Sequence, residues 1–125
     1  MKDFDQIHIL IVEDDSVTQY VTKLALDEQH IKCTVVDSGE KAIETLKSKQ
    51  FQCVLMDIVM PGEDGMDTVR WIRDSEDEYF KKLPIFALTS YSSDEHTKEV
   101  LDAGMNGHLV KPLDVEKLRK LYLDF

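Results

Sequence analysis

Short apolar runs and amphipathic patterns alternate five times along the chain. The runs are rich in branched side chains and predict strands at residues 7–12, 31–36, 53–57, 83–88 and 107–110. Between and after them, apolar residues recur with the period of a helix. We expect a first helix capped by Ser16. Further helices are expected to span residues 40–49, to follow Gly65, to run from a cap at Ser93 or Asp94 to Ala103, and to span residues 114–123. The apolar positions of the first helix are Val17, Tyr20, Val21 and Leu24.

The alternation of strand and helix predicts one α/β domain over residues 1–125. The strand runs are continuously apolar, which is typical of strands buried on both faces of a parallel sheet. We therefore expect a flavodoxin-like, doubly wound sheet of five parallel strands, in the order 2-1-3-4-5, with five helices. Residues 74–78 (DSEDE) are predicted to form a charged loop.

Reactive side chains stand where the predicted strands end. They are Glu13, Asp14 and Asp15 after the first strand, Asp57 at the end of the third, Thr89 after the fourth and Lys111 after the fifth. Parallel α/β sheets bind ligands at the carboxyl ends of their strands, near the point where the strand order reverses. We therefore expect these side chains to share one pocket.

Several carboxylates in one pocket predict a divalent cation, and their hard oxygen atoms favour Mg²⁺. A carboxylate beside such a cation can attack phosphorus, which makes Asp57 the candidate for an aspartyl phosphate. Lys111 and the Thr89 hydroxyl can hold the other phosphoryl oxygens. Each residue alone has an ordinary explanation, such as a helix cap for Asp15 or an exposed cation for Lys111. Their joint occurrence at strand ends favours the reactive pocket.

Charge and composition exclude several classes of partner. The chain has 25 acidic and 15 basic residues and a net charge of −10, which repels nucleic acid and anionic membrane surfaces. It has no apolar segment long enough for membrane insertion, and its acidic start is unlike a secretory signal. We expect a cytoplasmic protein. Cys33 and Cys53 fall in different strands without metal-site spacing, so they are predicted to be buried free thiols.

The segments ILIVEDD, VLMDIVMPGEDG, ALTS and HLVKPL resemble the receiver domain of two-component response regulators over essentially the whole chain. The resemblance implies that Asp57 accepts a phosphoryl group from the phosphohistidine of a sensor histidine kinase or a histidine phosphotransfer protein. It also implies an Mg²⁺ ion held by Glu13, Asp14, Asp57 and the main-chain carbonyl of Val59. A receiver of this kind catalyses only its own phosphorylation and dephosphorylation.

The resemblance also implies how the signal leaves the site. Thr89 would move to bond a phosphoryl oxygen, and a downstream protein would sense the face formed by residues 93–103, 107–110 and 114–123. At the position where the family usually has a Tyr or Phe that takes part in switching, this chain has His108. His108 has either a switching role or a purely structural one. Val59 and Tyr91 occupy the two positions that, in the family, flank the path of the water that attacks the aspartyl phosphate. Their bulk predicts a long-lived phosphoryl group.

Other hypotheses and contacts remain open on the sequence alone. The kinase side is expected to dock over the first helix and the Pro112 loop, with Gln19 and Thr22 as candidate contacts. An electron-transfer flavoprotein shares the fold, but the acids after the first strand would repel its phosphate. A phosphatase with an aspartyl intermediate would carry a second acid where this chain has Val59. A further alternative is a receiver-like module that is never phosphorylated. The chain is either a stand-alone receiver or part of a hybrid kinase or larger regulator.

Overall fold

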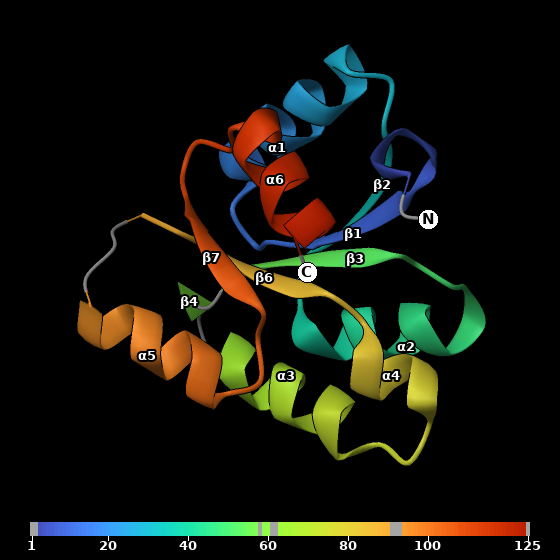
Figure 1. Cartoon of the computed structure of the whole chain (residues 1–125), viewed down its shortest axis with the longest axis vertical. Helices are drawn as coiled ribbons and strands as arrows, with labels where there is room; N and C mark the ends of the chain where they lie inside the picture. The colour runs from blue at the N-terminus through green and yellow to red at the C-terminus, as the bar shows by residue number, and fades with distance from the viewer. Residues whose placement is uncertain (1–2, 58, 61–62, 91–93, 125) are drawn as a thin grey trace.

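A parallel sheet of five strands forms the middle layer of the protein, and helices cover both of its faces (Figure 1). The computed structural model describes residues 3–57, 59–60, 63–90 and 94–124. The strands of the sheet are β1 (His8–Val12), β2 (Lys32–Val36), β3 (Cys53–Asp57), β6 (Ile85–Thr89) and β7 (Gly107–Val110). Their spatial order is β2-β1-β3-β6-β7 and all neighbours are parallel, which confirms the predicted fold class and strand order.

Two groups of helices enclose the sheet. One face carries α1 (Ser16–Glu28) and α6 (Val115–Asp124), and the other carries α2 (Gly39–Ser48), α3 (Gly65–Asp74), α4 (Glu78–Lys82) and α5 (Asp94–Asp102) (Figure 1). A short helix of the 3-10 type, η1 (Phe4–Gln6), packs on α6 through the rings of Phe4 and Tyr122, whose centroids are 5.7 Å apart. Within the described part of the chain, no helix is both long and apolar enough to cross a membrane.

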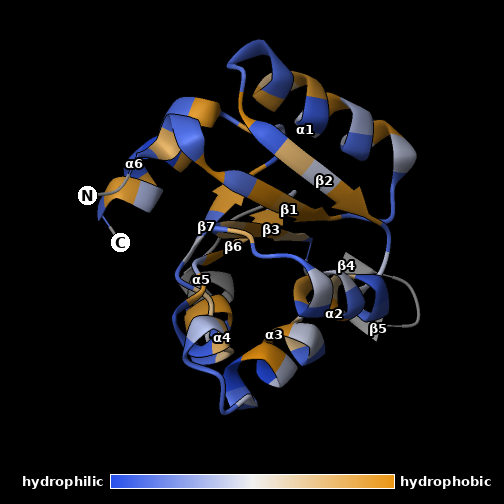
Figure 2. Ribbon diagram, turned by 90° about the vertical axis from the view of Figure 1, so that its right-hand side faces the viewer, coloured by the Kyte–Doolittle hydropathy of each residue, from blue (hydrophilic) through white to orange (hydrophobic). Residues whose placement is uncertain are grey.

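The core consists of two apolar layers, one on each face of the sheet. In β1, Leu10 and Val12 contribute to the layer under α2 and α3, while Ile9 and Ile11 contribute to the layer under α1 and α6. Every residue of β3 and β6 is buried, as the continuously apolar runs predict. Figure 2 colours most of β1 and β3 as hydrophobic, which agrees with their place in the middle of the core.

The structure has six α-helices in its described part, one more than expected, because α4 forms next to the predicted charged loop. The Asp77 side chain caps the start of α4 by accepting a hydrogen bond from the backbone N–H of Tyr79, and the Phe80 side chain is buried against the core. An unpredicted pair of short antiparallel strands, β4 (Val59–Met60) and β5 (Glu63–Asp64), follows β3. Asp15, and not Ser16, caps α1.

Helix α1 presents its apolar stripe to solvent. Val17, Tyr20, Val21 and Leu24 are 69%, 68%, 41% and 43% exposed. The side of α1 that faces the sheet instead buries Thr22 and Leu26. An amphipathic period identifies a stripe on a helix but not the surface that covers it, and here the described part of the domain leaves the stripe uncovered.

The prediction of buried free thiols is confirmed for Cys53 and only in part for Cys33. Both are free thiols, Cys53 buried and Cys33 half-buried. Each is aligned with Ile9 of the intervening strand β1, from opposite sides, so two strand spacings separate them. A disulfide cannot bridge that separation.

Candidate functional site

The carboxyl ends of four strands bring the predicted residues together. Val12 is aligned with Met56, Asp57 with Leu88, and Thr89 with Val110. Glu13 and Lys111 therefore follow directly after the aligned ends of β1 and β7, while Asp57 and Thr89 are the last residues of β3 and β6. They line a cavity of about 360 Å³ together with other polar side chains. The lining residues are Glu13, Asp14, Asp15, Thr18, Asp57, Thr89, Ser90 and Lys111.

Three carboxylates converge in this cavity. One oxygen from each of Glu13, Asp14 and Asp57 lies within 4.8 Å of the other two. Glu13 and Asp57 are buried, at 1% and 6% exposure, whereas Asp14 is exposed. The structure thus brings together three of the acids that the sequence analysis expects in one pocket.

Lys111 supplies the positive charge of the cavity. Its Nζ atom is 2.8 Å from Glu13 Oε1 and 3.6 Å from Asp57 Oδ2. Burial acts to lower the pKa of Lys111, but the ion pair with Glu13 and the charge of Asp57 outweigh it and hold that pKa above its ordinary value. Burial raises the pKa of Glu13, and the neighbouring Asp57 raises it further against the opposing effect of Lys111. One ammonium group thus neutralises the cluster only in part.

The acidic cluster suits a hard divalent cation. Although Lys111 Nζ is close, Glu13 Oε1 receives no well-aligned hydrogen bond from the described residues, and the atom is fully buried. A buried carboxylate oxygen with spare lone-pair capacity, next to two further carboxylates, is an all-oxygen donor set of the kind that Mg²⁺ prefers. The residues present therefore fit the predicted ion.

Asp15 has a structural role in the cavity wall. Its carboxylate accepts hydrogen bonds from the backbone N–H and the hydroxyl of Thr18, at 2.8 and 2.7 Å. These bonds, the side-chain one first, hold the pKa of Asp15 below its ordinary value. Asp15 is thus the N-cap of α1, which agrees with its place outside the predicted metal-ligand set.

The remaining predicted residues are placed unevenly. Thr89 is buried at the cavity, and its carbonyl accepts the backbone N–H of Lys111 at 2.7 Å. His108 is half-buried and aligned with Ala87, two residues before Thr89 on β6. Val59 begins β4, but its side chain and the whole of Tyr91 lie outside the described residues.

Of the two residues named as kinase contacts, Thr22 is not placed as predicted. Thr22 is buried at 1% exposure, so it cannot touch a partner on the surface of α1. Gln19 is half-buried, and its side-chain amide donates to the main-chain carbonyl of Glu13. No periodic or compositional signal in the sequence marks this bond, because it joins a helix residue to a loop carbonyl through local geometry alone.

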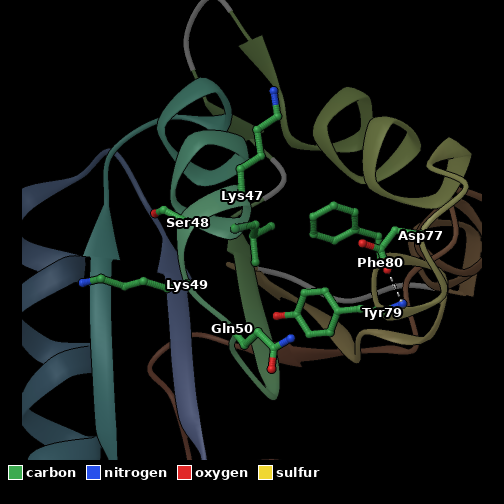
Figure 3. Close-up of a pocket in the computed structure, with 8 residues that line it drawn as sticks. Lys47, Ser48, Lys49, Gln50, Asp77, Tyr79 and Phe80 are labelled. Carbon is green, nitrogen blue, oxygen red and sulfur yellow. Dashed lines mark hydrogen bonds between the residues drawn. The ribbon is translucent and has the colours of Figure 1, made fainter.

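A second hollow, of about 420 Å³, lies at the opposite end of β3, between the end of α2 and α4 (Figure 3). Lys47 and Lys49 are among its lining residues, and its one carboxylate, Asp77, is the cap of α4. The Tyr79 hydroxyl accepts from the N–H of Phe51 at 2.6 Å and donates to the C=O of Phe51 at 2.7 Å. The Asp77 carboxylate and the Tyr79 hydroxyl of this hollow are thus already hydrogen-bonded. The acidic cavity is therefore the stronger candidate for chemistry.

Comparison with known proteins agrees with this geometry. The family profile described as response regulator receiver domain matches residues 9–123. The osmosensing histidine protein kinase SLN1 of Saccharomyces cerevisiae is 35% identical over 130 residues, which cover 99% of this chain and 10% of SLN1. The CAI-1 autoinducer sensor kinase/phosphatase CqsS of Vibrio cholerae is 34% identical over 110 residues, covering 88% of this chain and 16% of CqsS. The chain thus spans a small part of these relatives.

Solved structures match over almost the whole chain. The receiver domain of sensor histidine kinase PA1611 from Pseudomonas aeruginosa PAO1, solved with a magnesium ion coordinated in the active site cleft, has a TM-score of 0.81 and 31% identity. The match covers 94% of this chain and 95% of that one. A second match comes from the co-crystal structure of the S. cerevisiae histidine phosphotransfer signaling protein Ypd1 and the receiver domain of its downstream response regulator Ssk1. Its TM-score is 0.81 and its identity 28%, with 95% of this chain and 88% of that chain covered.

Proposed function

Because the chain belongs to the response regulator receiver domain family, whose members are phosphoacceptors in two-component and phosphorelay signalling, we propose that Asp57 is its phosphoacceptor within one receiver domain spanning residues 1–125. The observation that carries the proposal is the meeting of Glu13, Asp14 and Asp57 oxygens within 4.8 Å beside the Lys111 ammonium. Among the three acids, Asp57 is the one that ends the central strand β3, and its side chain is buried. A buried carboxylate fixed by a strand is well placed for in-line attack.

The proposed reaction moves one phosphoryl group from a histidine to Asp57. A carboxylate oxygen of Asp57 forms the new bond to phosphorus, while the bond from phosphorus to the imidazole nitrogen of the donor breaks. The imidazole leaves with the nitrogen electron pair and takes a proton from solvent. Lys111 and the Thr89 hydroxyl neutralise and hold the phosphoryl oxygens, as their positions beside Asp57 allow.

We assign the metal site of this chain to Glu13, Asp14 and Asp57, with the main-chain carbonyl of Val59 as a further ligand by family resemblance. When bound, Mg²⁺ supplies charge neutralisation for the transferred phosphoryl group. The PA1611 receiver, whose structure contains magnesium in the active site cleft, is 31% identical to this chain and supports the assignment.

The proposed output is a shift in the face formed by α5, β7 and α6. The hydroxyl of Thr89 moves toward the phosphoryl group, and the ring of His108, from the adjacent strand, follows into the vacated space. A downstream protein then recognises the altered face. In this scheme the chain is a signalling phosphoacceptor, and its own dephosphorylation is slowed by bulk at Val59 and Tyr91. Its cytoplasmic location stays a prediction from the sequence.

The phosphodonor protein is proposed to dock on α1. The exposed stripe of Val17, Tyr20, Val21 and Leu24 starts beside the acidic cavity, since Asp15 and Thr18 line that cavity. An apolar stripe of this kind fits a complementary apolar surface on the donor protein. The Ypd1 phosphotransfer protein, which was crystallised with the receiver domain of Ssk1, is the type of partner that the stripe would accept.

The test is phosphorylation by a small acyl phosphate in the presence of Mg²⁺, followed by intact mass measurement. We expect a gain in mass of one phosphoryl group, lost on alkaline treatment. Asp57→Asn should remain unmodified, whereas the matched control Asp15→Asn, which keeps a good helix cap, should be modified like the wild type. An unmodified wild type, or a modified Asp57→Asn, would overturn the proposal.

A further inference from the structure

The main-chain carbonyl of Glu13 is held by a side chain that neither catalysis nor metal binding uses. Gln19 lies in the first turns of α1, where its backbone N–H donates to the carbonyl of Asp15 at 2.9 Å. Its side chain turns back over the β1–α1 loop, and Nε2 donates a hydrogen bond to the oxygen of Glu13. Gln19 is half-buried, so its amide is committed to the loop and is not offered to solvent.

Glu13 is anchored at each of its other polar groups as well. Its N–H donates to the carbonyl of Val36 on β2 at 3.0 Å. Its Oε2 atom accepts the N–H of Asp15 at 3.1 Å, and its Oε1 atom is ion-paired with Lys111. The main-chain carbonyl is the remaining polar group of Glu13, and among the described residues it is the Gln19 side chain that holds it.

Asp14 has no such anchors. Its side chain is exposed, and no residue in the described part of the chain makes a hydrogen bond or ion pair with its carboxylate. The backbone is therefore the part of Asp14 that contacts with other residues can hold in place. Because the peptide unit is planar, the carbonyl of Glu13 and the N–H of Asp14 turn together, and a bond that fixes one fixes the other.

We infer that Gln19 is a positioning residue for the cation site: by holding the Glu13 carbonyl it fixes the peptide plane from which Asp14 reaches the oxygens of Glu13 and Asp57. The inference rests on the proposed function, because it assumes that the three acids bind Mg²⁺. Outer groups that orient carboxylate ligands commonly change metal affinity by about 10- to 100-fold when removed.

The experiment compares Gln19→Met with the matched control Gln29→Met. Methionine keeps the length of the glutamine side chain without its amide, and Gln29 is the exposed C-cap residue at the other end of the same helix. Mg²⁺ is titrated into each protein while the backbone amide signals of residues 13–15 are followed by NMR. We expect the dissociation constant for Mg²⁺ to rise about 10-fold in Gln19→Met and to stay at the wild-type value in Gln29→Met.

A second readout separates positioning from a loss of fold. The rate of phosphorylation by a small acyl phosphate is measured across Mg²⁺ concentrations. Gln19→Met should need more Mg²⁺ for half-maximal rate but reach a rate close to the wild type at saturation. If Gln19→Met is not folded, Gln19→Ala, which keeps a strong helix former in α1, takes its place.

The possible outcomes are distinct. Wild-type affinity for Mg²⁺ in folded Gln19→Met or Gln19→Ala overturns the inference while leaving the proposed function intact. Equal losses in Gln19→Met and Gln29→Met also overturn it, because they would reflect the stability of α1. A wild-type protein that neither binds Mg²⁺ nor becomes phosphorylated overturns the proposed function itself, and the inference with it.

Discussion

At the scale of single residues, Arg73 joins helix α3 to α4 and to the loop before β7. Among the described residues, the acceptors of its guanidinium group are all neutral: four carbonyl oxygens and one side-chain amide. They are Gly104 O at 2.8 Å, Phe80 O at 2.8 Å, Lys81 O at 3.2 Å, Leu83 O at 2.7 Å and Asn106 Oδ1 at 2.9 Å. The bonds satisfy the carbonyls at the end of α4 and fasten the loop before β7 to α3. Burial lowers the pKa of Arg73.

We predict that Arg73→Met destabilises the domain by roughly 3 kcal/mol, because it leaves several half-buried carbonyls without donors. The matched control is Arg70→Met on the same helix, where the exposed guanidinium pairs only with the exposed Asp67 at 2.8 Å. Loss of that pair should change stability by less than about 0.5 kcal/mol. Urea denaturation at fixed pH measures both variants. Equal effects in the two would contradict the assigned role of Arg73.

His108 allows a test of the switching proposal at one side chain. If its ring follows Thr89, His108→Ala should uncouple the output, so that phosphorylation no longer changes the affinity for the downstream protein, while Asp57 is still phosphorylated normally. His108→Tyr should retain the coupling, because flat rings of similar volume fill the same space. Binding is compared with and without a phosphoryl mimic. Unchanged coupling in His108→Ala would show that the histidine is only structural.

The lifetime of the phosphorylated state tests the two residues expected to hinder water. We predict that Val59→Asn combined with Tyr91→Glu shortens the lifetime of the aspartyl phosphate by at least about 10-fold, because polar side chains can position the attacking water. The decay is followed by intact mass after removal of the phosphodonor. A lifetime equal to that of the wild type would discard this explanation of slow dephosphorylation.

At the scale of elements, α1 differs from the other helices in what it leaves exposed. The side of α1 that covers the sheet buries Thr22 and Leu26. The apolar stripe is exposed and can contact a partner. In α2 and α3, by contrast, the apolar positions Ala42, Leu46 and Val69 belong to the core. An exposed stripe next to the reactive cavity is expected to act in protein recognition and not in stability.

We predict that Leu24→Ser slows phosphoryl transfer from a histidine phosphotransfer protein by roughly 10-fold, the effect of losing one well-packed interface side chain. Phosphorylation by a small acyl phosphate should be unchanged, because the cavity is not altered. Leu123→Ser on α6 is the matched control, since Leu123 is exposed to a similar degree, 47% against 43%. Transfer rates that fall equally with both donors would place the defect in the cavity and not in docking.

At the scale of the whole molecule, the sequence predicts the sheet better than its surroundings. Continuous apolar runs identify the five strands, and the polar residue that ends each run identifies the rim of the cavity, so Glu13, Asp57, Thr89 and Lys111 could be found without coordinates. Helix α4 could not, because its start depends on a single cap, Asp77, and its end on carbonyls that Arg73 binds from another helix. The sequence shows the apolar stripe of α1 but not that it faces solvent. The hydrogen bond from Gln19 to Glu13 likewise depends on tertiary structure and has no local sequence signal.

The charge of the cavity has a consequence for the stability of the entire domain. Three carboxylates gather around a single ammonium group, at spacings where like unit charges repel by on the order of 1 kcal/mol or more. Asp57→Asn removes one of these charges with little change in shape. It should therefore stabilise the protein by on the order of 1 kcal/mol when Mg²⁺ is removed by a chelator.

Saturating Mg²⁺ should reduce or reverse this difference, because the ion binds the wild-type cluster more tightly and stabilises the folded state by mass action. Urea denaturation in chelator and in Mg²⁺ gives the four free energies of unfolding. Asp74→Asn, which changes an exposed acid at the end of α3, is the control and should behave like the wild type in both conditions. A carboxylate that serves catalysis within a repulsive cluster is expected to lower the stability of the folded state. If Asp57→Asn were less stable than the wild type in chelator, Asp57 would instead be a structural residue.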